Sequence, residues 1–337
     1  MTGVQTCALP ISCVLQIAGI RLGFTICEDM WEQDPFKQAG DAGADLMINI
    51  NASPYHIHKL EQRQALLKQR SIEGGFPIIY VNLVGGQDEL VFDGASMAMS
   101  ASGECHYLAP NFEADLHLVN VEILNSDSQE FAAKRCEIPR QSLAAEQSSI
   151  ASVYHALVLG VRDYVNKNKF VGTVLGLSGG IDSALTLAIA VDALGKDRVQ
   201  AVMMPFEYTS KLSLDSAAEQ AQSLAVEYQV IPIRHIYAAF IEALEHEFAG
   251  MPVDVSEQNI QARCRGVILM AISNKKQLMV LTTGNKSECA VGYSTLYGDM
   301  AGGFDVLKDV SKTLVYQLAA YRNTEYGSQG EIGRAHV

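Results

Sequence analysis

The chain has 337 residues, a formal net charge of −13 and a hydrophobic content of 48%. This length predicts two domains, each with enough apolar side chains for a buried core. The acidic balance disfavours a nucleic-acid-binding surface, and the sequence holds no apolar run of membrane length. We therefore expect a protein that acts on small molecules, with no nucleic-acid or membrane partner.

The seven cysteines are odd in number and include no Cys-x-x-Cys pair, which excludes a simple disulfide framework and a zinc cage. The N-terminus lacks the cationic start of a secretory signal, because the first basic residue is Arg21. A reducing cytoplasm is the simplest location. Residues 1–11 and 328–337 resemble translated sequencing-library adapter, so we expect both tails to be non-native and the natural sequence to be truncated at both ends.

The first half of the chain alternates strand-like and helix-like segments. Apolar runs predict strands at residues 19–26, 44–50, 77–83 and 116–124, and helical spacing predicts a helix at 58–73. Residues 125–149 are polar and lack sustained periodicity, so we interpret them as a linker. The first domain is therefore expected to occupy residues 12–124.

A cysteine stands at the end of the first long strand. Cys27 follows the apolar run of residues 19–26, where a nucleophile gains exposure at the exit of a rigid sheet. A lone cysteine in such a place is more often a small buried hydrophobe. The residues alone leave both interpretations open.

The surroundings of Cys27 resemble a known domain. Cys27-Glu-Asp-Met-Trp31, Asn51-Ala-Ser-Pro-Tyr-His56 and the string over residues 81–96 are similar to the nitrilase superfamily, and in particular to the glutamine-amidase domain of glutamine-dependent NAD synthetases. The resemblance implies that Cys27 attacks the side-chain amide of glutamine, and that Ser53 and Lys59 hold the glutamine. It also implies a partial nitrilase-like α/β sandwich.

One departure from that family bears on activity. The family's catalytic Glu and Lys lie upstream of the cysteine, in a half-domain that this sequence does not contain. Glu28 and Asp29 adjoin Cys27 in sequence, but we assign them neither role. A thiol without a base and a cation is a weak nucleophile, so we expect these 337 residues to hydrolyse glutamine poorly or not at all.

The second half of the chain predicts a doubly wound parallel sheet over residues 150–327. After a helix from residue 150 to 165, apolar runs predict strands that alternate with helices. In such a sheet, ligands bind at the carboxyl ends of the strands. The expected strands are 171–177, 198–204, 228–233 and 277–282, and the expected helices are 181–194, 213–226, 236–248 and 256–275.

The turn after the strand of residues 171–177 carries the string Ser178-Gly-Gly-Ile-Asp-Ser183. Glycines let backbone N–H groups approach a polyphosphate, and the start of a helix adds partial positive charge. The string lacks the Gly-Lys-Ser/Thr ending of a Walker loop, and an ordinary glycine-rich turn is the alternative. It resembles the loop of ATP pyrophosphatases, which cleave ATP between the α- and β-phosphates.

Three further strings follow along the chain. Asn259 and Arg263 are four positions apart and share a helix face, where a solvated charged surface is the alternative. The string from Leu281 to Glu288 follows a strand, where a simple helix cap is the alternative. A glycine-rich aromatic loop over residues 292–304 is either a functional lid or disordered.

In this order the strings resemble the synthetase domain of NAD synthetases, of the adenine nucleotide alpha hydrolase-like fold. The resemblance implies ATP as co-substrate, Mg²⁺ as cofactor, deamido-NAD as the second substrate, ammonia released from glutamine as the nitrogen source, and a homo-oligomer in the intact enzyme. It implies ATP contacts at Ser178, Gly179, Gly180, Ile181, Asp182, Ser183, Thr283 and Lys312, magnesium ligands at Asp182 and Glu288, and deamido-NAD contacts at Asn259, Arg263, Glu288 and Asp299.

Two rival functions stay open. One is another amidotransferase of the ATP pyrophosphatase superfamily, and the other is a chain that binds nucleotide without turnover. A tRNA-modifying member would need basic patches that the sequence does not show.

Overall fold

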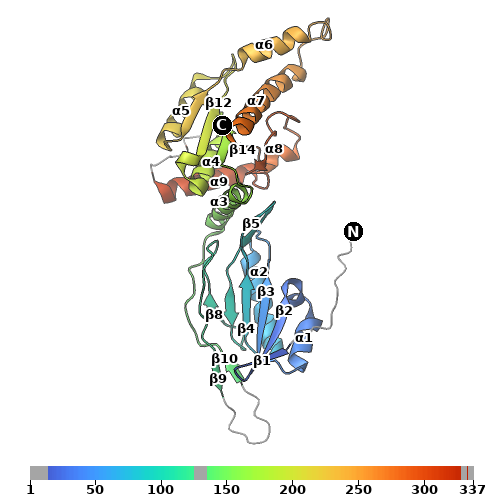
Figure 1. The fold of residues 1–337 in the computed structure, drawn as a ribbon, viewed down its shortest axis with the longest axis vertical. Helices are drawn as coiled ribbons and strands as arrows, with labels where there is room; N and C mark the ends of the chain where they lie inside the picture. Colours follow the sequence, from blue (N-terminus) through green and yellow to red (C-terminus); the bar gives the residue numbers. More distant parts are fainter. Residues whose placement is uncertain (1–13, 125–134, 328–331, 333–337) are drawn as a thin grey trace, which may run out of the picture. The chain divides into compact units, whose positions relative to one another are not determined.

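A computed structural model describes residues 14–124, 135–327 and 332 (Figure 1). The predicted non-native tails therefore lie outside the described residues, except for Ile332. The chain forms two units: residues up to 149 without 86–89, and residues from 150 onward together with 86–89. No helix among the described residues combines the length and the hydropathy that a bilayer span requires.

The first unit is built around a mixed sheet of six strands in the order β1-β2-β3-β4-β7-β8. The three central strands, β2, β3 and β4, are parallel, and β1, β7 and β8 join antiparallel. The bounds are β1 (Val14–Ile17), β2 (Ile20–Ile26), β3 (Leu46–Asn51), β4 (Ile78–Asn82), β7 (Met97–Met99) and β8 (Cys105–Leu108). Three of the strands predicted for this half thus form the centre of the sheet.

One face of this sheet packs against two helices, α1 (Gln33–Asp41) and α2 (Lys59–Gly74). Met47 and Ile78 point into this core, where they meet Phe36 of α1 and Leu67 of α2. The short helix η1 (Cys27–Met30) adds the fully buried Met30. These contacts fix the chain that leaves β2, and hence the position of Cys27.

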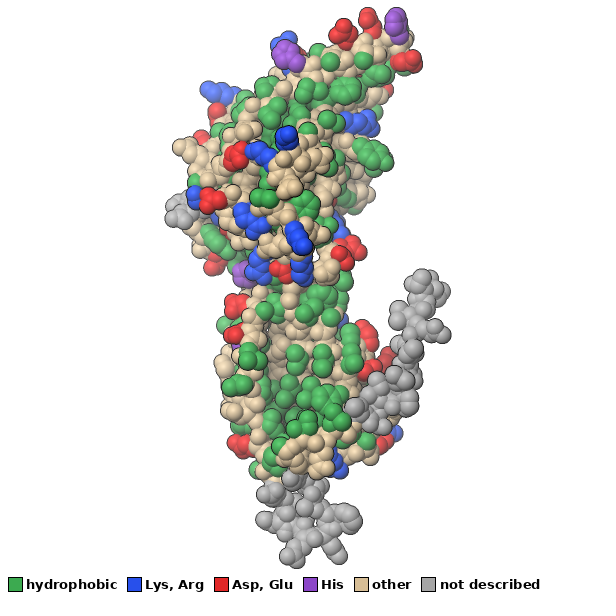
Figure 2. All heavy atoms as spheres, in the orientation of Figure 1, with side chains coloured by type: hydrophobic (Ala, Val, Ile, Leu, Met, Phe, Trp, Pro, Cys, Tyr) green, Lys and Arg blue, Asp and Glu red, His purple; other side chains and the backbone are tan. Residues whose placement is uncertain are grey.

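The opposite face of the sheet is apolar and partly exposed. Ile26, Ile50 and Val81 are register partners on adjacent strands and are 61%, 52% and 43% exposed. Figure 2 shows hydrophobic side chains gathered over this sheet. Strands that bury one face usually carry polar residues on the other, and this sheet does not.

Two short two-stranded ribbons lie outside the two main sheets. One is the hairpin of β5 (Val84–Gln87) and β6 (Leu90–Asp93), and the other pairs β9 (Glu122–Leu124) with β10 (Arg135–Glu137). The strand expected at 116–124 is wrong except for its last three residues, because Leu116 and Leu118 are exposed and pair with no strand. Part of the stretch interpreted as a linker instead packs on this unit, where Cys136 and Ile138 are buried.

The second unit contains a five-stranded, fully parallel sheet in the order β13-β12-β11-β14-β15. The predicted doubly wound sheet is confirmed. Successive strands first progress to one side of β11 and then continue on its other side with β14. Its strands are β11 (Gly172–Gly176), β12 (Val199–Met203), β13 (Glu227–Val230), β14 (Leu278–Thr282) and β15 (Phe304–Asp305).

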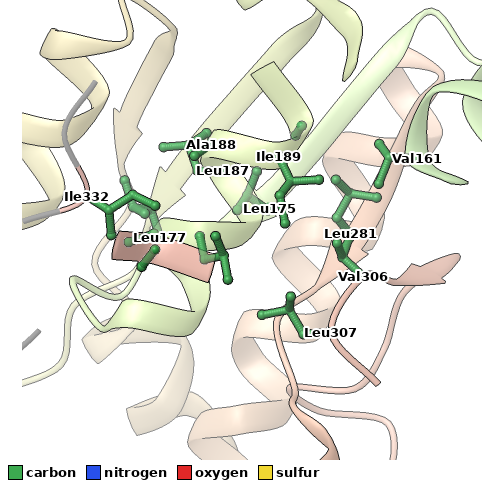
Figure 3. Packing of buried hydrophobic residues seen from close by; sticks show 14 of the residues in the cluster. Val161, Leu175, Leu177, Leu187, Ala188, Ile189, Leu281, Val306, Leu307 and Ile332 are labelled. Carbon is green, nitrogen blue, oxygen red and sulfur yellow. The ribbon is translucent and has the colours of Figure 1, made fainter. Parts of the chain in front are cut away.

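Helices cover both faces of this sheet. Leu175 and Leu281 face one core, which Figure 3 shows together with Val161 and Ile189, whereas Val174 and Val280 face the other. Ile332, within the predicted non-native tail, is 3% exposed and packs in the first of these cores. The helices are α3 (Ser149–Lys167), α4 (Ile181–Leu194), α5 (Lys211–Ser223), α6 (Arg234–Ala243), α7 (Val255–Lys276), α8 (Lys286–Ala290) and α9 (Lys312–Tyr326), with a short η2 (Lys196–Arg198).

Candidate functional site

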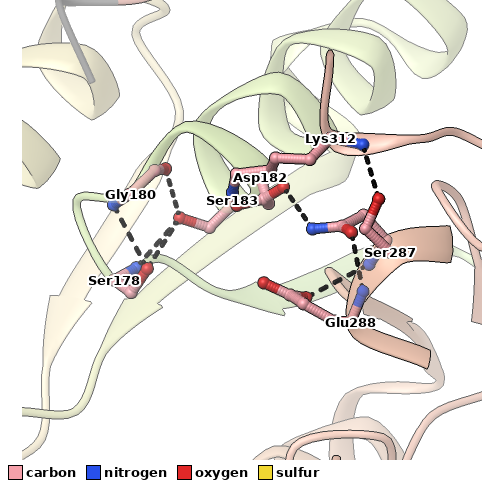
Figure 4. Close-up of polar contacts among 8 residues, drawn as sticks. Ser178, Gly180, Asp182, Ser183, Ser287, Glu288 and Lys312 are labelled. Carbon is pink, nitrogen blue, oxygen red and sulfur yellow. Dashed lines mark hydrogen bonds and ion pairs between the residues drawn. The ribbon is translucent and has the colours of Figure 1, made fainter. Parts of the chain in front are cut away.

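The loop between β11 and α4 is held in shape by its own serines. The hydroxyls of Ser178 and Ser183 lie 3.0 Å apart, and the Ser183 hydroxyl donates to the carbonyl of Gly180 at 3.0 Å. The Gly180 N–H donates in turn to Ser178 Oγ at 3.2 Å. Figure 4 shows this ring of contacts at the start of α4.

Glycine is required at position 179 of this loop. Gly179 has a φ of +83°, and a Cβ there would lie 2.4 Å from the carbonyl oxygen of Ser213. Ser183 is 2% exposed and Ile181 is 7% exposed, with its side chain in the core. Ile181 could therefore contact a nucleotide only through its backbone. The Ser183 hydroxyl stabilises the loop by its hydrogen bonds to Ser178 and Gly180.

Three charged side chains from distant segments meet beside this loop. Asp182 lies in the first turn of α4, Glu288 in α8 and Lys312 at the start of α9. The ammonium of Lys312 contacts Asp182 Oδ2, while Asp182 Oδ1 accepts a 2.9 Å hydrogen bond from the amide of Asn285. Asn285 also binds Glu288 through two hydrogen bonds, of 3.0 and 3.3 Å. Figure 4 shows Asp182, Glu288 and Lys312 close to one another.

Asp182 and Glu288 line a cavity of about 480 Å³ at the carboxyl ends of β11, β12 and β14, whereas Asn285 and Lys312 contact these carboxylates without lining it. That is the place where open α/β sheets bind their ligands, and the volume suits a small molecule. Of the residues predicted to bind substrates, six line the cavity: Ser178, Asp182, Ser183, Thr283, Glu288 and Asp299. Burial raises the pKa of the Asp299 carboxyl, and the nearby charge of Arg265 opposes that shift.

Other predicted residues lie near the cavity without lining it. Asn259 accepts a hydrogen bond from the Thr295 hydroxyl at 3.0 Å, and Arg263 Nε donates to the carbonyl of Leu296 at 3.3 Å. Both thus hold the loop of residues 292–304 against α7. The exposed Tyr293 and Tyr297 of this loop are 80% and 85% accessible, and Tyr293 reaches the cavity.

Sequence reasoning missed two residues at this site. Arg265 lines the cavity, and its Nε donates to the carbonyl of Met204 at 3.3 Å. It does not lie on the helix face that Asn259 and Arg263 share, and the prediction was based on that face. Asn285 is fully buried between two carboxylates. Its place at the N-cap of α8, three residues before Glu288, was the available signal.

The carboxylates suit a magnesium ion that arrives with a nucleotide. Within residues 14–124 and 135–327 and at 332, no cluster of three or more His, Cys, Asp or Glu side chains could hold a metal by itself. Asp182 and Glu288 supply two hard oxygen ligands that face one cavity. Mg²⁺ binds through one or two carboxylates and completes its shell with water and phosphate oxygens, so the donor set fits.

The first unit places its predicted residues at the carboxyl edge of the mixed sheet. Cys27 begins η1 directly after β2 and has a left-handed φ of +49°, a conformation that costs a non-glycine residue about 1–3 kcal/mol. Ser53 is 6% exposed, and its N–H donates to Asn82 Oδ1 at 2.9 Å. Lys59 begins α2, with its Nζ 4.3 Å from the centre of the Trp31 ring.

The acidic neighbour of Cys27 is engaged in the turn itself. Asp29 Oδ2 accepts the N–H of Ile26 at 2.9 Å, which closes the turn after β2. Arg70 fixes the same segment by donating to the carbonyls of Met30 and Trp31 at 3.0 and 2.8 Å. The site thus presents a partly exposed thiol on a strained residue, and the Asp29 carboxylate two positions later stabilises the backbone.

Two known protein families match most of the length of the chain. The sequence model described as NAD synthase matches residues 153–326, just over half of the chain. The chain belongs to the NAD synthase family. The carbon-nitrogen hydrolase model matches residues 8–130, which agrees with the nitrilase-like resemblance around Cys27.

The similarity to individual relatives covers both units of this NAD synthase-family chain. A glutamine-dependent NAD(+) synthetase of Acinetobacter baylyi is 45% identical over 92% of this chain, and one from Xylella fastidiosa strain 9a5c is 49% identical over 93%. The chain spans 56% of the length of each. The solved glutamine-dependent NAD+ synthetase of Acinetobacter baumannii, in complex with ADP, matches with a TM-score of 0.86 and 44% identity over 95% of this chain and 60% of that one.

Proposed function

We propose that this chain converts deamido-NAD to NAD at the cavity of its second unit, with ATP cleaved to AMP and pyrophosphate. The observation that carries the proposal is the meeting of the 178–183 loop, Asp182, Glu288 and Lys312 at the carboxyl ends of β11 and β14. A glycine loop that opens a helix binds phosphate, and two carboxylates with a lysine suit a metal-bound triphosphate. Family membership and the ADP complex of the A. baumannii relative support the same choice.

The reaction begins with activation of a carboxylate. The nicotinate carboxylate of deamido-NAD attacks the α-phosphorus of ATP, and pyrophosphate leaves with the electron pair of the broken P–O bond. The loop backbone and Lys312 offset the repulsion between the two anions. When bound, Mg²⁺ at Asp182 and Glu288 supplies further charge compensation for the departing pyrophosphate.

Ammonia then replaces AMP on the activated carbonyl. Its lone pair attacks the acyl carbon, AMP leaves, and the nitrogen loses a proton to give the amide. Water would compete with ammonia, so the site must be closed during this step. We assign closure to the loop of residues 292–304, which is bound to α7 by Asn259 and Arg263. Together with Asp299, these two residues would orient deamido-NAD.

The intact enzyme would take its ammonia from glutamine at Cys27, with Ser53 and Lys59 holding the substrate. We propose that the present 337 residues use free ammonium instead. Thiolate attack needs a base and a cation, yet Asp29 is committed to the turn and Lys59 stacks over Trp31. A cytoplasmic location and a homo-oligomeric assembly are part of the same proposal for the intact enzyme.

A turnover assay tests the reaction. The chain is supplied with ATP, Mg²⁺, deamido-NAD and ammonium chloride, and nucleotide products are separated by chromatography. We expect AMP and NAD in equal amounts, and no activity in Asp182→Ala, since this change removes a carboxylate from the phosphate site. ADP with orthophosphate, or unchanged activity in the variant, would refute the proposal.

A second function, nucleotide binding without turnover, is favoured by one observation. The chain spans only 56% of the length of its curated relatives. Thermal unfolding with and without ATP and Mg²⁺, together with the assay for AMP, separates the two functions, because a ligand that binds only the native state stabilises it increasingly as the ligand concentration rises above Kd. A stabilised chain that forms no AMP would establish binding alone.

A further inference from the structure

Asn285 is buried between the two carboxylates of the nucleotide site. Its side chain is 0% exposed, and it precedes α8, whose first turn contains Glu288. The side-chain amide donates to Asp182 Oδ1 at 2.9 Å, across 103 positions of sequence. Its Oδ1 accepts the Glu288 N–H at 3.0 Å, and its own N–H donates to Glu288 Oε2 at 3.3 Å. One residue therefore binds both carboxyl groups.

Helix capping alone does not account for this residue. Ser, Thr and Asp cap helices about as well as Asn, because capping needs only an oxygen that accepts a backbone N–H. Among these side chains only asparagine also offers an N–H donor. At this position that donor points at Asp182. An aspartate would keep the cap and place a third carboxylate beside the other two.

Asn285 binds only one of the two oxygens of each carboxylate. Asp182 Oδ1 is bound by Asn285, which leaves Oδ2, the oxygen that now faces Lys312. Glu288 Oε2 is bound by the backbone of Asn285, which leaves Oε1. Each carboxylate thus has one oxygen fixed by Asn285 and one that Asn285 does not bind.

We propose that Asn285 is a positioning residue that sets the spacing and the free oxygens of Asp182 and Glu288 for a metal-bound nucleotide. The proposal rests on the proposed function, because it assigns a divalent cation to that site. Residues that orient metal ligands typically contribute 10–100-fold to metal affinity. Asn285 would act entirely through the two carboxylates and would not touch the cation.

The test measures metal binding directly. Mn²⁺ is titrated into the chain with α,β-methylene-ATP, and free Mn²⁺ is read by electron paramagnetic resonance. Asn285→Ser keeps an oxygen for the cap but loses the donor to Asp182, and Asn285→Asp keeps the shape but replaces the donor with a charge. We expect both variants to bind Mn²⁺ at least about 10-fold more weakly. Metal-free binding of the nucleotide analogue in EDTA should be unchanged in Asn285→Ser, whereas the added charge of Asn285→Asp should weaken it.

The control is a second helix cap of the same design. Asp254 caps α7 by accepting the Ser256 N–H at 2.7 Å, and its own N–H donates to Glu257 at 2.8 Å, on an exposed surface. Asp254→Ser makes the corresponding substitution at an exposed cap and should leave Mn²⁺ binding unchanged. This comparison separates a change of capping residue from the loss of metal-ligand orientation.

Each outcome decides a different question. Unchanged Mn²⁺ affinity in Asn285→Ser, or a parallel loss of metal-free nucleotide binding, overturns the positioning role. Mn²⁺ binding that depends on Asn285 in a chain that forms no AMP supports that role and refutes the proposed reaction. If the wild-type chain takes up no Mn²⁺ with the nucleotide analogue, both proposals fail.

Discussion

The ammonium group of Lys312 contacts the carboxylate of Asp182, 130 positions earlier in the chain. Asp182 lies in the first turn of α4 and Lys312 begins α9, so the ion pair joins the N-termini of two helices (Figure 4). Helix N-termini carry partial positive charge. Lys312 and the two helix N-termini therefore place positive charge beside Asp182, and a polyphosphate bound here would compete with Asp182 for Lys312.

Replacing Lys312 with alanine should weaken ATP binding more than it weakens the fold. The Lys312 side chain is 38% exposed, and exposed ion pairs contribute at most about 1 kcal/mol to stability. A charged hydrogen bond to phosphate is worth about 1.5–3 kcal/mol, so the KM for ATP should rise roughly 10- to 100-fold. Steady-state AMP formation at varied ATP measures the effect.

Lys276→Ala is the matched control for that experiment. Lys276 pairs with Glu227 at 2.8 Å and ends α7, next to the amino end of β14 and away from the cavity. Its removal should leave the KM for ATP unchanged. Similar KM values in the two lysine variants would show that Lys312 does not meet the triphosphate.

Cys27→Ala should leave ammonium-dependent AMP formation unchanged, because Cys27 lies in the first unit and the proposed synthetase site is built from the second. Glutamine should give little or no activity with either protein, because thiolate attack needs a base and Asp29 is bound to the Ile26 N–H. The rates with the two nitrogen donors, measured side by side, check both statements. A glutamine-dependent rate that disappears in Cys27→Ala would show that the thiol is active.

The elements of the synthetase unit were predictable because its three central strands, β12, β11 and β14, are buried on both faces. Residues such as Val174 and Leu175 face opposite cores, and a continuous apolar run results. The 178–183 loop was predictable from its glycines and serines, since φ at Gly179 and the crowding by Ser213 admit no side chain. Local chemistry sufficed for both features.

Features that depend on contacts between segments far apart in the sequence could not be predicted. The bond between Asn285 and Asp182 depends on how α4 and α8 lie across the sheet, and sequence spacing carries no such information. Leu116 and Leu118 alternate like a strand, but no neighbouring strand accepts them, so they stay exposed. Cys136 and Ile138 are buried by contacts with the first unit, although their polar surroundings resemble a linker.

The buried ion pair of Arg63 and Asp93 should be important for the stability of the first unit. Both side chains are 1% exposed, and Arg63 Nη1 donates to Asp93 Oδ1 at 2.9 Å. Arg63→Met would leave a buried carboxylate without its main partner, which typically costs about 3–5 kcal/mol. Urea unfolding followed by the fluorescence of Trp31, the single tryptophan, reports on this unit.

A double variant and a surface variant make that measurement specific. Arg63→Met with Asp93→Leu removes both charges and should recover most of the lost stability. Arg21→Met removes a 44% exposed arginine that pairs with Asp45, and its effect should be smaller. A double variant no more stable than Arg63→Met would show that packing of the arginine, and not its charge, supports the unit.

Asp305→Asn should stabilise the second unit at neutral pH and lose this advantage in acid. Burial raises the pKa of Asp305 above its ordinary value of 3.8, so the native state favours the protonated carboxyl. The favourable contribution of that carboxyl is complete below pH 3.8 and is lost as the pH rises through the raised native pKa. Asparagine has nearly the same shape and never ionises, so it avoids this loss.

The difference in melting temperature between Asp305→Asn and the wild-type chain, measured from pH 4 to pH 8, should therefore grow with pH and then level off. Asp309→Asn serves as the control, because Asp309 lies on the exposed surface four residues further along the chain. Its difference should stay nearly constant over the same range. A constant difference for Asp305→Asn would mean that the native and unfolded chains bind this proton equally, in spite of the burial of its carboxyl group.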